Sequence, residues 1–148
     1  MADNLFTQLH QEHQNFKMLF EQILEQKNVD AKVDLFNNLK KTLIPHMKSE
    51  EEVFYPELYN HGDTKEMSLE ALEEHHVAET TLMELSKSDP FMENWRPKAK
   101  VLSEILNHHI EEEESEIFNA ARDIIPQNRQ NEIYTQYIQK KDEILKSM

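Results

Sequence analysis

The sequence predicts an all-α protein, an up-down-up-down four-helix bundle with an additional C-terminal helix. Apolar residues recur at helical spacing almost throughout the chain. The 148 residues include a single glycine and five prolines, a composition that disfavours a turn-rich β fold. Short breaks separate four long periodic segments, each of which would span about 40–50 Å as a helix. Long helices joined by short connections pack as antiparallel neighbours in a bundle.

The first two helices are expected at about residues 3–28 and 31–60. The sequence Asn-Val-Asp at 28–30 breaks the periodicity, and Asp30 is a suitable cap for the second helix. Pro45 lies inside the second helix, where the missing N–H group predicts a kink or a local loss of backbone pairing.

Glycine, aspartate and proline residues also mark the ends of the remaining helices. Gly62 is suited to a left-handed cap that ends the second helix, and a third helix follows at about 64–87. Asp89 before Pro90 predicts the cap and first turn of a fourth helix, which runs to about 124 before Pro126 ends it. A shorter fifth helix at about 127–146 is expected outside the bundle or across one end. We therefore expect a single domain over 1–148, with the bundle at about 3–125.

Composition and charge exclude several classes of function. The net charge of −13 makes nucleic acid an unsuitable partner, and no run of 18 apolar residues is present to span a membrane. The N-terminal residues lack the basic and apolar regions of a secretory signal. The absence of cysteine excludes disulfides, thiolate zinc sites and iron–sulfur clusters. A cytoplasmic protein is expected.

The eight histidines are concentrated in the predicted helices, and only His61 falls in a predicted loop. The second and fourth helices each contain a His-x-x-x-Glu motif, which places an imidazole and a carboxylate one turn apart on one face. The first and third helices each contain a Glu-His pair. This order resembles a duplicated helical hairpin. The His-x-x-x-Glu motifs are His46–Glu50 and His109–Glu113. The Glu-His pairs are Glu12-His13 and Glu74-His75.

Such ligands can hold a pair of metal ions when they project inward from all four helices at one level. Imidazole suits iron, and carboxylates can bridge two ions. An isolated His-x-x-x-Glu is usually an exposed pair, but these residues lie beside apolar stripes, where unpaired polar groups are costly. The combination predicts metal ligation by His13, His46, Glu50, His75, His109 and Glu113.

Spacing leaves one ligand open. His75 is favoured over His76 because Ala78 rather than Glu79 lies one turn on. In the fourth helix His108 and His109 both have a glutamate four residues later, and the apolar phase does not decide between them.

The acidic runs at 50–52 and 111–116 are otherwise expected to form solvated faces. Core packing is the expected role of Tyr55 and Tyr59.

At these residues the sequence resembles the hemerythrin-like family, also called the HHE cation-binding domain. The segment 43–56, LIPHMKSEEEVFYP, resembles the family's first His-x-x-x-Glu-Glu block, and 109–118 resembles the second. The resemblance covers about residues 5–125 and implies a four-helix bundle with an oxo- or hydroxo-bridged pair of iron ions. It also favours His109 and Glu113 as the ligands from the fourth helix.

One departure from the family bears on function. Oxygen-carrying hemerythrins have a further histidine one turn before the third-helix ligand, and Ala71 occupies that position here. Reversible oxygen carriage is therefore not expected. His10, one turn before His13, is a candidate additional ligand.

The resemblance implies a centre that binds or reacts with oxygen, nitric oxide or peroxide in a sensing, detoxifying or iron-handling role. One alternative is iron storage or donation, or repair of other metal centres. Another is an enzyme with peroxidase-like, catalase-like or oxidase activity. A third is a metal-free bundle that acts through its fifth helix as an interaction protein. The protein partner is not predicted by any motif.

Overall fold

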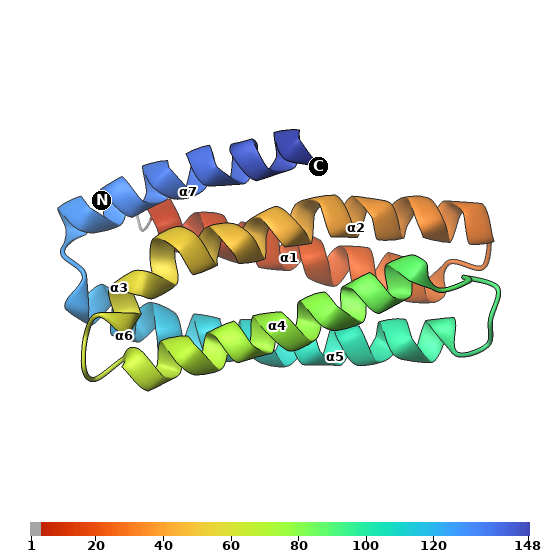
Figure 1. Cartoon of the computed structure of the whole chain (residues 1–148), viewed down its shortest axis with the longest axis horizontal. Coiled ribbons are helices and arrows are strands. Elements are labelled where there is room, and N and C mark those ends of the chain that lie inside the picture. The colour runs from red at the N-terminus through yellow and green to blue at the C-terminus, as the bar shows by residue number, and fades with distance from the viewer. Residues whose placement is uncertain (1–3) are drawn as a thin grey trace.

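The computed structural model describes residues 4–148, and all regular structure in that range is helical. Two π-helical turns join α2 to α3 and α5 to α6, so the second and fourth predicted helices are each one continuous helix with a π turn inside (Figure 1). The elements are α1 (Asn4–Glu25), α2 (Val29–Ser49), η1 (Glu50–Phe54), α3 (Tyr55–Tyr59), α4 (Lys65–Lys87), α5 (Trp95–Glu112), η2 (Glu113–Ile117), α6 (Phe118–Ile124) and α7 (Gln127–Ser147).

The helices form a bundle elongated along their common direction (Figure 1). Helix α1 packs against α2 and α5, and α4 packs against α5 and α3. Helix α7 lies outside the bundle along α1, α2 and η1, which agrees with the expected position of the fifth helix. Within residues 4–148, no helix is long and apolar enough to cross a membrane. The predicted all-helical class is confirmed.

Two apolar clusters fill the interior, and a layer of polar side chains separates them. Along α1, for example, Leu9 belongs to one cluster and Phe16 to the other, and the buried His13 lies between them. Along α4, Ala71 and Ala78 flank His75 in the same way. The two clusters provide the hydrophobic stabilisation of the fold, and they hold the polar layer away from water.

Several helix boundaries differ from the sequence prediction. Asn28, not Asp30, caps α2, because its Oδ1 accepts a hydrogen bond from the N–H of Ala31. Gly62 does not adopt a left-handed conformation, since no glycine in the described range has positive φ. The fourth helix begins at Trp95 rather than Pro90, after a turn in which Asp89 accepts from the N–H of Phe91.

Pro45 does not end α2, which continues to Ser49. One backbone hydrogen bond is missing at Pro45 because proline has no N–H, and a further departure from α-helical pairing comes at η1, where the carbonyl of Glu50 accepts from the N–H of Tyr55, five residues later. The carbonyl of Glu113 accepts from Phe118 in the same way. Each π turn adds one residue and rotates everything after it, which explains why the apolar phase of the fourth helix gave no clear register.

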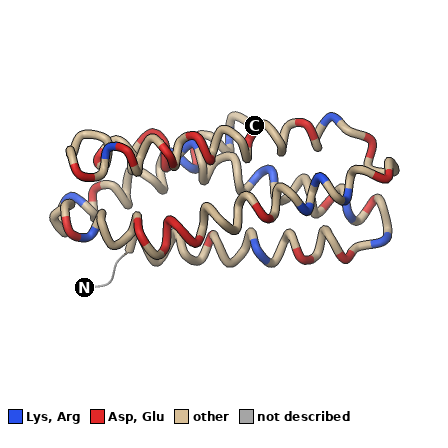
Figure 2. The backbone as a smooth tube through the Cα atoms, turned by 90° about the horizontal axis from the view of Figure 1, so that it is seen from below, with Lys and Arg blue, Asp and Glu red and all other residues tan. Residues whose placement is uncertain are grey.

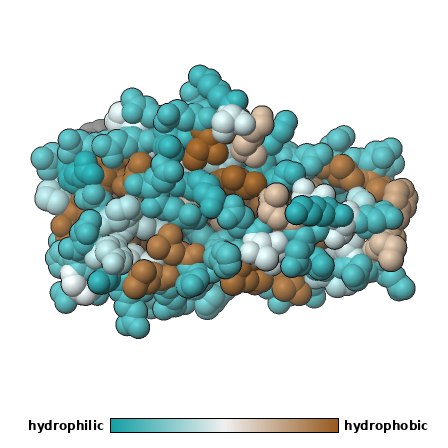
Figure 3. Space-filling model, in the orientation of Figure 1, coloured by the Kyte–Doolittle hydropathy of each residue, from teal (hydrophilic) through white to brown (hydrophobic). Residues whose placement is uncertain are grey.

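The surface is strongly polar. Charged positions occur along the whole length of the backbone (Figure 2), and acidic residues outnumber basic ones, 29 to 16. The face seen in Figure 3 is mostly hydrophilic, with apolar side chains scattered over it. Scattered exposed apolar groups are normal on a protein surface.

Leu82→Ala tests the larger apolar cluster, because Leu82 is fully buried in α4. We expect the free energy of unfolding to fall by about 2–5 kcal/mol, since the substitution removes buried methyl groups and leaves a cavity. Urea denaturation measures the change. Leu69→Ala, at a position 43% exposed on the same helix, is the matched control, with an expected change of about 0.5 kcal/mol or less. Equal effects at the two positions would contradict this assignment of the core.

Candidate metal centre

Six side chains of the polar layer converge between the two apolar clusters. They come from all four long helices, and none is more than 3% exposed. Each of the two glutamates stands at the first residue of a π turn. They are His13 on α1, His46 on α2, Glu50 in η1, His75 on α4, His109 on α5 and Glu113 in η2. The structure therefore brings together every residue of the predicted ligand set.

The six side chains form two overlapping groups that share Glu50 and Glu113. One group adds His13 and His46, the other adds His75 and His109, and in each group four potential ligand atoms lie within 4.8 Å of one another. Two cations could thus each take two imidazoles while both carboxylates serve the pair.

The inward-facing atoms are the Nε2 atoms of the imidazoles and the oxygens of the two carboxylates. His13 Nε2 lies 3.1 Å from Glu113 Oε1, and His46 Nε2 lies 3.2 Å from Glu50 Oε1. In the second group, His75 Nε2 lies 3.3 Å from Glu50 Oε1. His109 Nε2 is 3.5 Å from Glu113 Oε2.

Several of these atoms have no hydrogen-bond partner. Within the described chain, His13 Nε2, Glu50 Oε2 and Glu113 Oε1 are fully buried and make no hydrogen bond of good geometry, although His13 Nε2 and Glu113 Oε1 lie 3.1 Å apart. Unpaired buried polar atoms are rare in proteins because each costs the full energy of desolvation. Here they face one another across the centre, as metal ligands would. The residues therefore fit a metal centre.

A second set of four glutamates surrounds the histidines. Each accepts a hydrogen bond from the outward Nδ1 of one histidine, and each bond joins two different helices or turns. The four bonds are His46–Glu12 at 2.8 Å, His75–Glu51 at 2.8 Å, His109–Glu74 at 2.6 Å and His13–Glu114 at 2.6 Å. A carboxylate on Nδ1 fixes the ring and leaves the Nε2 lone pair facing inward, the usual arrangement around a metal-binding histidine.

These four carboxylates were not predicted as part of the site. Glu51 and Glu114 belong to acidic runs that were expected to be solvated, and that expectation is wrong for them. Glu12 directly precedes His13, and Glu74 directly precedes His75. Each of these glutamates bonds instead to a histidine of the next long helix. The repeated Glu-His and Glu-Glu pairs were the only sequence pattern that could have pointed to these four glutamates. The geometry of a single helix does not show which neighbouring helix a glutamate side chain contacts.

The buried charges shift one another's pKa strongly. Burial alone would lower the pKa of His46, but Glu50 and Glu12 outweigh it and raise the pKa to about 10. Burial also opposes protonation of His109, and Glu113 and Glu74 raise its pKa to about 10. Burial favours the neutral acid at Glu12, but the hydrogen bond from His46 helps lower that pKa to about 2. Protons therefore compete with a metal cation for this centre.

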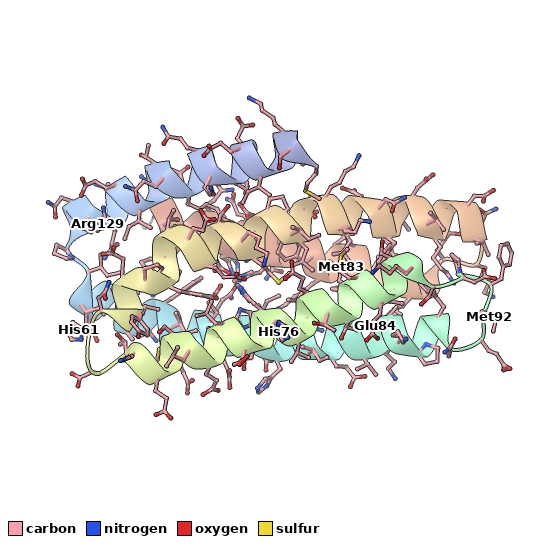
Figure 4. The ribbon with its side chains drawn as sticks, viewed as in Figure 1. His61, His76, Met83, Glu84, Met92 and Arg129 are labelled. Atoms are coloured by element: carbon pink, nitrogen blue, oxygen red, sulfur yellow. The ribbon has the colours of Figure 1, made fainter. Side chains whose placement is uncertain are left out.

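The remaining histidines lie outside both groups. His10, the candidate additional ligand, has a side chain 53% exposed and contacts Glu114 at 3.0 Å, so the structure does not place it among the ligands. His108 is 66% exposed and pairs with Glu112, which resolves the choice that spacing left open in favour of His109. His61 lies in the turn at one end of the molecule, as expected from the sequence (Figure 4).

Tyr55 packs in an apolar cluster, as expected, and its hydroxyl also reaches the centre. It is fully buried, and its hydroxyl donates to Glu113 and lies 3.2 Å from His75 Nε2 and 3.3 Å from His109 Nε2. Burial and the nearby carboxylates raise the pKa of Tyr55 well above its usual value. Tyr59, by contrast, is 44% exposed, so the core packing expected of it is wrong. The π turn that begins at Glu50 directly precedes Tyr55, and sequence periodicity gave no sign of it.

Comparison with known proteins agrees with this geometry. The family model described as Hemerythrin HHE cation binding domain matches residues 4–121, which include all six converging side chains. The chain belongs to this family. The HHE-domain match ends before α7, so the C-terminal helix is not covered by it.

One curated relative of this HHE domain is described as a DNA nickase, from Nostoc sp. (strain PCC 7120 / SAG 25.82 / UTEX 2576). The two sequences are 27% identical over 145 residues. The alignment covers 95% of this chain and 40% of the relative, so the chain spans well under half of that protein's length. No solved structure matches the chain significantly.

The metal-free HHE domain should lose stability as pH rises. The pKa values of His46 and His109 are near 10 in the folded protein and about 6.5 in an unfolded chain. Their stabilisation is complete below about pH 6.5 and is lost as pH approaches about 10, while the partner carboxylates stay ionised. Urea denaturation with a chelator present, at several pH values in this window, measures it. Stability that rises with pH would contradict the assigned ion pairs.

Tyr55→Phe should destabilise the metal-free protein by about 1.5–3 kcal/mol, because buried Glu113 loses a charge-assisted hydrogen bond while the ring packing is kept. Urea denaturation in the presence of a chelator measures the change. Tyr59→Phe is the matched control at an exposed tyrosine in the same short helix, where a change of about 0.5 kcal/mol or less is expected. Equal stability of the two variants would show that the hydroxyl of Tyr55 contributes nothing to the centre.

Proposed function

We propose that this chain is a non-haem di-iron protein whose centre binds or reacts with oxygen, nitric oxide or peroxide. The observation that carries the proposal is the pair of overlapping four-residue groups that share Glu50 and Glu113. A single-metal site needs only one such group. Two groups with two common carboxylates suit two cations held side by side.

The donor set supports iron. Each position offers two imidazole nitrogens and a share of two carboxylates, which suits iron, zinc or manganese, and thiolate ligands are absent. The resemblance to hemerythrins favours iron among these metals. When bound, two iron ions would supply redox chemistry and coordination positions that the protein does not fill.

The surroundings favour a reactive or sensing centre over an oxygen carrier. Ala71 is buried at the position where oxygen carriers have a fifth histidine, and His10 does not replace it. Tyr55 instead brings a hydroxyl beside His75 and His109. This hydroxyl is a hydrogen-bond donor inside the centre, and a buried donor can stabilise negative charge that develops on a bound ligand.

An iron-handling role is the second candidate function. A cavity of about 270 Å³ opens between α4 and η2 beside Ala71 and Glu74. Its lining includes the acidic residues Asp63, Glu66, Glu70, Glu74, Glu112 and Glu116. Negative charge attracts cations, and Glu74 itself bonds to His109, so this side is suited to metal entry or exit. Transfer of iron from the loaded protein to an apo acceptor tests this role.

The activity named for the Nostoc relative is not part of the proposal. The relative is more than twice as long as the aligned chain, and its name describes the whole protein. The chain carries a net charge of −13, and a strongly acidic protein repels the phosphate backbone of DNA.

The histidine doublet on α5 provides a matched test. His109→Ala should bind fewer than two iron ions per chain and lose the near-ultraviolet and visible charge-transfer absorption that appears on aerobic loading. His108→Ala, one residue away and exposed, should keep both. Metal analysis of protein purified without a His tag gives the stoichiometry, and absorption spectroscopy gives the second readout. Two bound irons with a silent spectrum, or equal behaviour of the two variants, would contradict the proposal.

A further inference from the structure

The C-terminal helix α7 reaches the candidate metal centre from outside the bundle. Tyr137 donates a hydrogen bond to Glu12 Oε1 at 2.5 Å, and its oxygen lies 3.0 Å from His46 Nδ1. Lys141, one turn later, donates to Glu12 Oε2 at 2.5 Å. Glu12 is the carboxylate that orients His46, so α7 reaches this ligand both through Glu12 and through the direct contact of Tyr137.

Both oxygens of Glu12 are fully engaged. Oε1 accepts from His46 and Tyr137, and Oε2 accepts from Gln8 and Lys141. Tyr137 is completely buried and packs in the apolar cluster that also contains Ile133. Docking of α7 therefore covers most of Glu12, whose side chain is 13% exposed, and fixes its carboxylate at both oxygens.

Glu74 is the counterpart of Glu12 in the second helical hairpin, and in the described part of the chain no helix from outside the bundle donates hydrogen bonds to it. Glu74 orients His109 as Glu12 orients His46, at 2.6 Å. Within residues 4–148, however, no lysine or tyrosine bonds to Glu74, which instead lies in a group with His108 and Glu112 and borders the acidic cavity. The repeated halves of the bundle thus supply the same ligands but unequal outer contacts.

Outer contacts of this kind affect metal affinity. Loss of a carboxylate partner of a metal-binding histidine typically weakens binding by about 10–100-fold, because the ring is no longer held in the required tautomer and orientation. A contact that holds the carboxylate acts one step further out, through the same imidazole. Loss of such a contact to Glu12 should disturb the orientation of the His46 ring and leave the rings of His75 and His109 as they are.

We propose that α7 is a functional part of the metal centre, with Tyr137 and Lys141 as positioning residues. They act through Glu12 on His46, so the metal position built by His13 and His46 depends on docked α7, and the position built by His75 and His109 does not. This inference rests on the proposed two-metal function. It goes beyond that function because it makes the two positions unequal and assigns a role to a helix outside the family match.

Anaerobic titration of the full-length metal-free protein with Co²⁺, followed by visible absorption, tests the inference. The wild-type protein should bind two equivalents. Tyr137→Phe combined with Lys141→Met should weaken one equivalent by about 10-fold or more and leave the other within about twofold. Lys140→Met is the matched control, because Lys140 is the next residue back along α7 and bonds to Glu52 instead. It should bind both equivalents as the wild type does.

Single-site backgrounds identify which position is affected. With His75→Ala the remaining position is the one at His13 and His46, and addition of Tyr137→Phe should weaken it. With His13→Ala the remaining position is the other one, and Tyr137→Phe should leave it unchanged. Circular dichroism verifies that each variant retains its helices, and Lys141→Arg should restore binding lost in Lys141→Met because it restores a cationic donor.

The outcomes separate this inference from the proposed function. Two wild-type equivalents that the α7 variants leave unchanged, or weaken equally, would overturn the inference and leave the two-metal proposal standing. Fewer than two equivalents in the wild-type protein would overturn both. Selective loss of the position at His13 and His46 is the result that supports the role of α7.

Discussion

Burial of six ionisable ligand groups in one layer is the constraint on which the rest of this structure depends. Isolated charges or unpaired polar atoms in an apolar interior would cost more than a small domain gains from its core. The layer persists because carboxylates and imidazoles neutralise one another, and because four outer glutamates satisfy the remaining ring nitrogens. A pair of cations would satisfy the atoms that are still unpaired.

The outer glutamates also link the helices in a closed order. Each helix or its π turn supplies a carboxylate to the histidine of the next long helix, and the last bond, from η2 to α1, completes the circuit. The two apolar clusters on either side of this layer keep the helix axes aligned along the bundle. The hydrogen bonds of the polar layer and the packing of the two apolar clusters therefore specify the same arrangement of helices. Such agreement favours a single folded state.

The repeat in the sequence does not make the centre symmetric. One half has α7 behind it, with Glu12 held at both oxygens. The other half has Tyr55 inside it and an acidic cavity outside it. Because metal reactivity depends on the groups around the ligands as much as on the ligands, these differences matter more to function than the shared motif does.

The sequence by itself predicted the helices and four of the six converging residues, His13, His46, Glu50 and His75. In the fourth long helix it left two equivalent His-x-x-x-Glu pairs open. Apolar periodicity marks a helix, and His46 and Glu50, four residues apart, must share one face of it. Only the tertiary structure decided that His109 rather than His108 faces inward, that Glu12 serves a histidine on another helix, and that Tyr55 enters the centre. Those outcomes depend on π turns and on contacts between helices. A local pattern carries no information about which distant side chain will lie opposite.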